Sequence, residues 1–311
     1  MTNTSITFGF LTGATTADDI QALEALSYDA LWVGGHVASR NPSPEALMQL
    51  ARLAALTTHI RVGTAALLLP LYPPAIVAKQ VADLDRVSGG RIVLGVGVGG
   101  EYPQEFDACG VPIAERGART DEAIPLLRLL WSADEVNHYG WFHEMGPVRI
   151  HPAPLQPGGP PILIAGRSPA AMRRAARLGD GWMPYLYSPE RYDKSVHEVR
   201  SHADAIGRSL DEFSWTAFVF VNVEDRAEDA IAGAAAFLGG SFKQDVGPLL
   251  DRVAAVGTPE QVAARLRDFV DAGARHLIIA PATNRDPLLL ARRVAAEVRP
   301  LVDPAARDHQ R

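Results

Sequence analysis

Short apolar segments rich in β-branched residues alternate with helical periodicity along almost the whole chain, and this alternation constrains the fold most strongly. The expected strands cover residues 6–11, 29–35, 60–70, 91–97, 161–166, 181–185, 214–223 and 276–281. Each is followed by at least one segment with helical periodicity, so the pattern predicts an α/β protein with a parallel sheet covered by helices. Eight such units in 311 residues favour a closed (β/α)8 TIM barrel over an open sheet.

The regular alternation is interrupted once, after the fourth expected helix. Residues 132–160 contain an expected hairpin followed by a proline-rich run, and 240–256 is the other weakly patterned stretch. We find no internal repeat and no low-complexity linker, which predicts one domain over 1–311 with an insertion after the fourth helix. We expect substrate contacts from the loop after His36, from 132–160 and from 240–256, all near the carboxyl ends of the strands.

A glycine pattern at the end of the fourth strand raises an alternative fold. Gly95, Gly97 and Gly100 match the G-x-G-x-x-G spacing of a dinucleotide-binding turn. That turn belongs in the first strand–helix unit and leads directly into a helix. Here it follows the fourth strand, and residues 101–112 intervene before the expected helix. We therefore interpret these glycines as sites where a flat ligand approaches the end of a barrel strand.

Charge and cysteine content exclude several classes of function. The formal net charge of −6 argues against a nucleic-acid-binding surface. Cys109 is the single cysteine, so no intrachain disulfide and no thiolate metal cluster are expected, and a cytoplasmic location follows as the default. His138 and His143 share the expected hairpin without further ligands at a suitable spacing, so we predict no metal site. We expect no signal peptide and no membrane span.

Six sequence blocks in order resemble the bacterial luciferase-like oxidoreductases, also called luciferase-like monooxygenases. They are YDALWVGGHV, RVGTAALLLP, VADLDRVSGGRIVLGVGVGGEYPQEF, ERGARTDEAI, PILIAGRSPAAMRRAARLGDGW and VGTPEQVAARLRDFVDAGARHLII. Each block alone is unspecific, but together they span roughly residues 5–300. The resemblance implies a TIM barrel that binds coenzyme F420 or FMN at its C-terminal mouth.

The resemblance also implies which residues hold the cofactor. They come from the ends of the third, fourth and fifth strands: Thr64, Ala65, Ala66, Gly97, Val98, Gly166, Arg167 and Ser168. A cis peptide between Ala65 and Ala66 is implied at the end of the third strand. At the fifth strand, Ser168 can cap the next helix, whose N–H groups and positive dipole end suit a phosphate. Arg167 adds a positive charge there.

His36 and Glu101 are the candidate catalytic residues. His36 follows the second strand, where a histidine could exchange a proton near the reactive part of the cofactor ring. In deazaflavin-dependent relatives the matching histidine follows an acid, but here Gly35 occupies that position, which leaves the orientation of His36 without an evident support. Glu101 follows the glycines of the fourth strand and matches an acid that takes part in proton transfer in a sugar-phosphate dehydrogenase branch. An exposed loop carboxylate is the other interpretation of Glu101.

The sequence thus predicts an oxidoreductase that uses coenzyme F420 for hydride transfer to or from a small organic substrate. The alternatives are an FMN-dependent monooxygenase of a two-component system, supplied by a separate reductase, and a non-catalytic flavin-binding protein. A homodimer is expected from the resemblance, and no nucleic-acid or membrane partner is expected.

Overall fold

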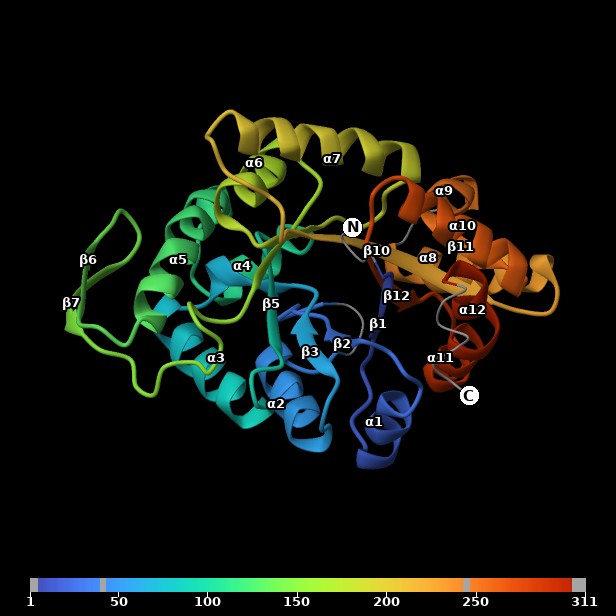
Figure 1. Ribbon diagram of the computed structural model, residues 1–311, viewed down its shortest axis with the longest axis horizontal. Helices are drawn as coiled ribbons and strands as arrows, with labels where there is room; N and C mark the ends of the chain where they lie inside the picture. Colours follow the sequence, from blue (N-terminus) through green and yellow to red (C-terminus); the bar gives the residue numbers. More distant parts are fainter. Residues whose placement is uncertain (1–4, 40–42, 243–246, 304–311) are drawn as a thin grey trace. The chain divides into compact units, whose positions relative to one another are not determined.

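The computed structural model describes residues 5–39, 43–242 and 247–303, and Figure 1 shows its helices and strands, with labels for most of them. The chain packs as two compact units. Unit 1 takes the described residues of Met1–Trp32 and Met183–Arg311, and unit 2 consists of Val33–Trp182.

Unit 2 contains the middle strands of the sheet and the helices that follow them. Its elements are α2 (Ala46–Leu56), β3 (Arg61–Thr64), β4 (Leu67–Leu68), η1 (Leu69–Leu71), α3 (Pro74–Ser88), β5 (Ile92–Gly97), α4 (Pro103–Ala108), η2 (Ile113–Glu115), α5 (Arg116–Trp131), β6 (Val136–Tyr139), β7 (Glu144–Val148), β8 (Ile162–Ala165) and α6 (Pro169–Leu178). Strands β2 (Ala30–Val33) and β9 (Gly181–Met183) lie where the chain passes between the units.

Unit 1 contains the first and last strands. Its elements are β1 (Thr7–Leu11), α1 (Ala17–Glu24), α7 (Pro189–Asp204), β10 (Ser214–Val223), α8 (Ala227–Phe242), α9 (Gly247–Val253), β11 (Ala254–Gly257), α10 (Pro259–Asp271), β12 (His276–Pro281), α11 (Pro287–Arg293), η3 (Val294–Val298) and α12 (Arg299–Val302).

The strand pairings form a closed ring, and the chain is a (β/α)8 barrel as the sequence predicted. The order is β10-β12-β1-β2-β3-β5-β8-β9, and β9 pairs again with β10. Strand β11 pairs with β10 outside this ring, and β4 pairs with β5. The expected strand over 60–70 is therefore divided into β3 and β4, separated by Ala65 and Ala66.

The strands and helices form where the local sequence favours them. All six residues of β5 are buried, as expected for a parallel strand that is covered on both faces. Helix α3 starts with Pro74 in its first turn and ends at Gly89, whose φ of 71° places it in the left-handed region that glycine adopts easily. Fully buried side chains such as Phe8, Leu50 and Leu94 form the core.

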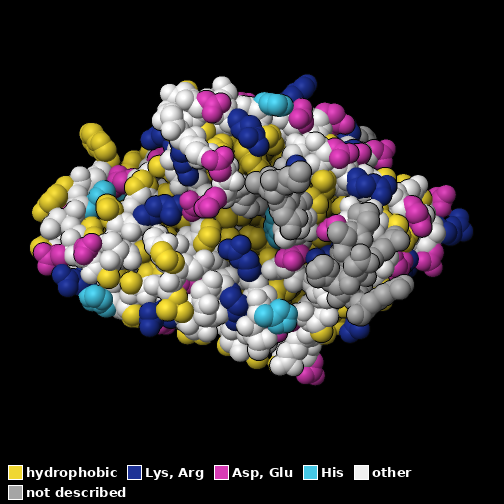
Figure 2. All heavy atoms as spheres, viewed as in Figure 1, with side chains coloured by type: hydrophobic (Ala, Val, Ile, Leu, Met, Phe, Trp, Pro, Cys, Tyr) yellow, Lys and Arg dark blue, Asp and Glu magenta, His cyan; other side chains and the backbone are white. Residues whose placement is uncertain are grey.

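The hairpin formed by β6 and β7 is attached to the outer side of α5. Glu122 of α5 accepts hydrogen bonds from the backbone N–H groups of Trp141, Phe142 and His143 at 2.9–3.1 Å. Figure 1 shows the hairpin outside α5, away from β5. At the same place Figure 2 shows projecting hydrophobic side chains, and Trp141 in the hairpin turn is 96% exposed.

The segment between the hairpin and β8 is attached to α3. The buried Asp85 carboxylate accepts hydrogen bonds from the N–H groups of Leu155 and Gln156 at 2.8 and 2.9 Å. The Gln156 amide also donates to the carbonyl oxygen of Ile92, the first residue of β5, at 2.9 Å. This segment therefore reaches the amino end of β5.

These contacts correct one expectation about the 132–160 insertion. From the sequence we expected it to supply substrate contacts at the carboxyl ends of the strands. Its hairpin instead lies outside α5, away from β5, and its last part is held by Asp85 near the amino end of β5 (Figure 1). Of the other two proposed substrate segments, residues 40–42 and 243–246 lie outside the described residues.

We expect the free energy of unfolding to decrease as the pH falls below about 6.5. Burial, assisted by the positive charge of Arg119, holds the pKa of His143 below its ordinary value despite Glu122. Burial acts to raise the pKa of Glu122, but the hydrogen bonds from His138 and the hairpin backbone outweigh it and lower that pKa. Both groups bind protons more readily when the chain is unfolded, so stability is present at neutral pH and is lost on acidification.

Urea unfolding between pH 5 and 7.5 measures this effect. The His143→Gln variant should show a shallower pH dependence over that range, because the partly buried imidazole is gone. The matched control is His197→Gln, which alters a side chain that is 76% exposed and should leave the slope nearly unchanged. An unaltered slope in His143→Gln would show that His143 is not the group responsible.

Candidate functional site

The carboxyl ends of four neighbouring strands bring together the segments that the sequence singled out. Strand β3 pairs in parallel with β5, and β5 pairs in parallel with β8, so these strands end at one edge of the sheet. The Ala65 N–H donates to the Val33 carbonyl oxygen at 2.7 Å, which places the end of β2 beside the end of β3. In barrels of this kind ligands bind at this edge.

Small residues lie side by side at the ends of β3, β5 and β8. A Cβ atom added to Gly97 would lie 3.6 Å from the Ala66 Cβ and 3.7 Å from the Ala165 Cβ. The Leu68 side chain lies beside them, 3.8 Å from the same Cβ position, so the ends of these strands carry small or apolar groups that suit one face of a flat ring system. We call Ala66, Gly97 and Ala165 the small-residue floor.

The loop after β2 lies directly against the chain after β3. A Cβ atom at Gly35 would lie 2.0 Å from the Ala66 carbonyl oxygen and 2.8 Å from the Leu67 Cα. Residue 35 must therefore be glycine, because any side chain would collide with backbone atoms. The peptide bond between Ala65 and Ala66 is cis, as the resemblance implied.

The His36 ring faces a carboxylate, which corrects the expectation that nothing supports its orientation. Nδ1 of His36 lies 3.2 Å from Oε2 of Glu105. The Glu105 side chain has no exposed surface, whereas that of His36 is 33% exposed. The Tyr102 ring meets the His36 ring edge-on, with 4.9 Å between the ring centres. His36 is thus held on two sides and remains accessible.

Glu101 is not the carboxylate that contacts His36. It lies exposed in the loop after β5, four residues before Glu105. The acid that reaches His36 comes instead from α4, a short helix that the sequence analysis did not predict. One signal for α4 was present, because Pro103 in Tyr-Pro-Gln-Glu-Phe suits the first turn of a helix. Six residues are too few to show helical periodicity.

The start of α6 has the features of an anion-binding helix end. Ser168 caps the helix by accepting a hydrogen bond from the Ala171 N–H at 3.2 Å, and Arg167 and Ser168 are both exposed. Gly166 has a φ of 130°, a conformation that favours glycine. The buried Trp182 donates from its indole nitrogen to the Gly166 carbonyl oxygen at 2.9 Å. Ser168 and Gly166 are therefore fixed where β8 ends, next to the small-residue floor.

Two of the proposed cofactor residues, Thr64 and Val98, are poorly placed for a polar contact with a ligand. Thr64 is fully buried, and its hydroxyl donates to the Gly95 carbonyl oxygen at 2.7 Å, so the side chain ties β3 to β5. Val98 follows the end of β5 and is half-buried. Neither side chain presents a polar group to a ligand.

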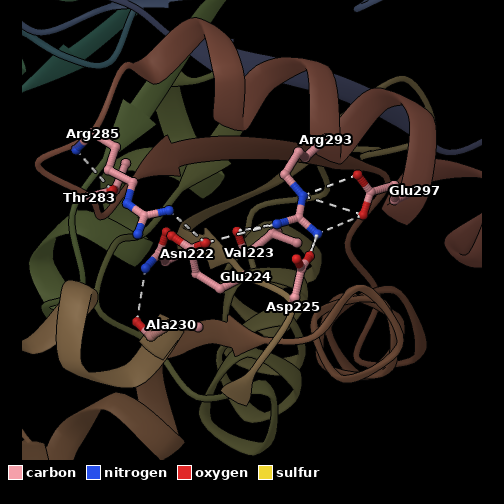
Figure 3. A network of polar contacts seen from close by, with 9 residues as sticks. All are labelled: Asn222, Val223, Glu224, Asp225, Ala230, Thr283, Arg285, Arg293 and Glu297. Atoms are coloured by element: carbon pink, nitrogen blue, oxygen red, sulfur yellow. Dashed lines mark hydrogen bonds and ion pairs between the residues drawn. The ribbon is translucent and has the colours of Figure 1, made fainter. Parts of the chain in front are cut away.

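The ends of the seventh and eighth barrel strands, where TIM barrels frequently bind phosphate, are occupied by ion pairs in unit 1. Figure 3 shows this network, which follows β10 and β12. Arg285 pairs with Glu224 at 2.9 Å. Arg293 pairs with Asp225 at 2.8 Å and with Glu297 at 2.9 Å. Three carboxylates surround two guanidinium groups, so the local charge disfavours an anion.

The described part of the chain lacks two kinds of feature. No group of three or more His, Cys, Asp or Glu residues is arranged to hold a metal ion there. No helix among those residues is long and apolar enough to cross a membrane.

Curated relatives include dehydrogenases and monooxygenases. An uncharacterised protein of Mycobacterium tuberculosis is 39% identical over 168 residues, which is 54% of this chain and 57% of that protein. The match therefore spans little more than half the length of that relative. The F420-dependent glucose-6-phosphate dehydrogenase of Amycolatopsis mediterranei is 28% identical over 82% of this chain and 84% of its own length. The 4-hydroxyprotoasukamycin monooxygenase of Streptomyces nodosus subsp. asukaensis is 32% identical over 67% of this chain and 58% of its own.

Solved structures share the fold over almost the whole chain. An F420-dependent secondary alcohol dehydrogenase, in complex with an F420-acetone adduct, superposes with a TM-score of 0.84 at 19% identity and covers 96% of this chain and 99% of its own. A monooxygenase from Streptomyces bottropensis has a TM-score of 0.81 at 26% identity and covers 95% of this chain and 99% of its own. The first likeness, at under 25% identity, bears on the fold alone.

The family model described as luciferase-like monooxygenase matches residues 12–276. This span includes His36, Glu105, the small-residue floor and the start of α6. The chain belongs to the luciferase-like monooxygenase family.

Proposed function

We propose that this chain is an oxidoreductase that binds coenzyme F420 and transfers a hydride to or from a small organic substrate. The observation that carries the proposal is the small-residue floor, flanked by His36 on one side and by the capped start of α6 on the other. The chemistry of these groups fits a cofactor with a flat ring and a phosphate. The relatives named F420-dependent glucose-6-phosphate dehydrogenase, 28% identical over as much as 93% of this chain, support F420 as that cofactor.

Different residues bind the ring, bind the phosphate and exchange the proton. Ala66, Gly97 and Ala165 receive one face of the ring, and Arg167, Ser168 and the N–H groups of α6 hold the phosphate. Coenzyme F420 supplies the hydride chemistry when it is bound. Nε2 of His36 takes a proton from the substrate oxygen when the substrate is oxidised and returns it in the reverse direction.

A second candidate function is an FMN-dependent monooxygenase that receives reduced flavin from a separate reductase. The 32% identical monooxygenase of Streptomyces nodosus subsp. asukaensis favours it. The small-residue floor and the start of α6 suit FMN as well, since FMN also has a flat ring and a phosphate. A flavin-binding protein without catalytic activity is the remaining alternative. For each of these functions we propose a homodimer in the cytoplasm.

Separate titrations of the purified chain with coenzyme F420 and with FMN test the proposal. Isothermal calorimetry should show saturable binding of F420 and at least tenfold weaker binding of FMN. The reverse order would favour the monooxygenase, and binding of neither would overturn both functions. Turnover of reduced F420 with a panel of small carbonyl compounds then separates an enzyme from a flavin-binding protein.

The double variant Arg167→Ala/Ser168→Val should weaken cofactor binding several-fold to a hundredfold, equivalent to about 1–3 kcal/mol for lost charge-assisted hydrogen bonds. Calorimetric titration of the variant with the intact cofactor and with a form lacking the phosphate measures this loss. Only the intact cofactor should lose affinity.

The matched control is Arg173→Ala, which removes an exposed arginine from the same helix further from its start. It should bind the cofactor as the unmodified chain does. Equal losses for the phosphorylated and dephosphorylated forms in the double variant would place the phosphate elsewhere.

A further inference from the structure

The Glu105 carboxylate is buried and accepts several hydrogen bonds. Oε1 accepts from the backbone N–H groups of Val37 and Ala38 at 2.6 and 2.9 Å, and Nδ1 of His36 lies 3.2 Å from Oε2 and 3.3 Å from Oε1. A buried carboxylate is stable only when its oxygens have such partners. Glu105 therefore holds both the imidazole and the backbone that follows it.

The fixed position of Glu105 comes from the packing of α4. The next residue, Phe106, is fully buried in a small apolar cluster with Leu68 and Leu71. The carbonyl oxygen of Ala38 also accepts a hydrogen bond from the Gln104 amide at 3.4 Å. Helix α4 is thus attached to the chain after β4 and to the loop that carries His36.

This geometry explains how the chain functions without an acid next to His36 in the sequence. Residue 35 has no room for a side chain because the Ala66 carbonyl oxygen lies where its Cβ would be. A carboxylate for His36 must therefore come from another element, and α4 brings Glu105 to the required side of the ring.

We infer that Glu105 is a positioning residue that keeps the proton of the neutral His36 ring on Nδ1 and leaves Nε2 as the proton-exchanging atom. A carboxylate has acceptor oxygens only, so Nδ1 must carry the hydrogen if its contact with Glu105 is a hydrogen bond. The edge-on contact with Tyr102 fixes the plane of the ring. The consequence for catalysis rests on the proposed function, whereas the position of the proton does not.

Nitrogen-15 NMR of histidine-labelled protein without cofactor tests the position of the proton. The His36 signals are identified by their loss in His36→Asn. At a pH where the ring is neutral, the unmodified chain should show a protonated Nδ1 and an unprotonated Nε2. A neutral ring protonated on Nε2 in the unmodified chain would overturn the inference, whatever the variants do.

The Glu105→Gln variant should reverse the tautomer. Its amide oxygen can still accept from Val37 and Ala38, but its NH2 group can only donate, so Nδ1 must become the acceptor. Asp107→Asn, which removes an exposed carboxylate from the same helix, should leave the His36 signals unchanged. Unchanged His36 signals in a folded Glu105→Gln variant would also overturn the inference.

Measurement of kcat tests whether Glu105 contributes to catalysis through His36. In Glu105→Gln, kcat should fall by about a hundredfold or more, because the wrong tautomer cannot exchange the proton at Nε2, with cofactor affinity unchanged. Asp107→Asn should retain full kcat. A reversed tautomer with unchanged kcat would remove the positioning role in catalysis. A chain that binds neither F420 nor FMN but shows the expected tautomer would refute the proposed function alone.

Discussion

Replacing His36 with asparagine should lower turnover by about a hundredfold to ten-thousandfold, the usual contribution of general acid–base catalysis. Asparagine has a similar size and can hydrogen-bond with Glu105, but it cannot exchange a proton. The interaction that is lost matters mainly in the transition state, so cofactor affinity should change little. Measuring cofactor occupancy by calorimetry and turnover per bound cofactor on the same preparation separates the two quantities.

A purely structural role for His36 predicts the opposite pattern. The variant would then lose folding stability or cofactor binding, while turnover per bound cofactor would be preserved. His197→Asn, which replaces an exposed histidine of α7, is the matched control and should retain full turnover. Full turnover of His36→Asn at full occupancy would remove His36 from the mechanism.

The barrel was predictable because its strands have a strong local signal. A buried parallel strand needs a continuous apolar run, and the six buried residues of β5 show how directly that pattern appears in the sequence. Pro74 and Gly89 likewise mark the ends of α3 through backbone preferences of single residues. Such signals depend on a few neighbouring positions, so they can be identified from one sequence.

The placement of the 132–160 insertion was wrong because it depends on contacts between distant residues. The insertion is held by hydrogen bonds of two carboxylates. Glu122 accepts from the hairpin turn about 20 positions away, and Asp85 accepts from residues 155–156 about 70 positions away. Nothing in the local pattern distinguishes a buried aspartate or glutamate with such partners from an exposed one on a helix.

The candidate site shows the same limit. The sequence and the resemblance identified His36, the small residues at the strand ends and Ser168, all of which the structure brings to one edge of the sheet. Glu105 was missed because its role depends on α4 folding back toward residues 36–38, while Glu101 looked equivalent in the sequence. The position of the cofactor remains a prediction for each of these residues.

Gly35 shows how a departure from the family pattern can be a steric requirement. The resemblance implied an acid before the histidine, and its absence suggested an unsupported imidazole. The distance of 2.0 Å between a Cβ at residue 35 and the Ala66 carbonyl oxygen explains the glycine. The supporting carboxylate has another origin in this chain.

Gly35→Ala should therefore lower the free energy of unfolding by about 2–4 kcal/mol, because the added methyl group meets backbone atoms that cannot rotate away. The neighbouring Gly34→Ala is the matched control, since a Cβ there meets nothing within 4 Å, and its effect should stay within about 0.5 kcal/mol. Urea unfolding of the two variants under identical conditions measures the difference.

Because relief of the collision must displace Ala66 or the His36 loop, Gly35→Ala should also weaken cofactor binding, whereas Gly34→Ala should not. Two variants of equal stability would show that the loop after β2 does not lie against Ala66.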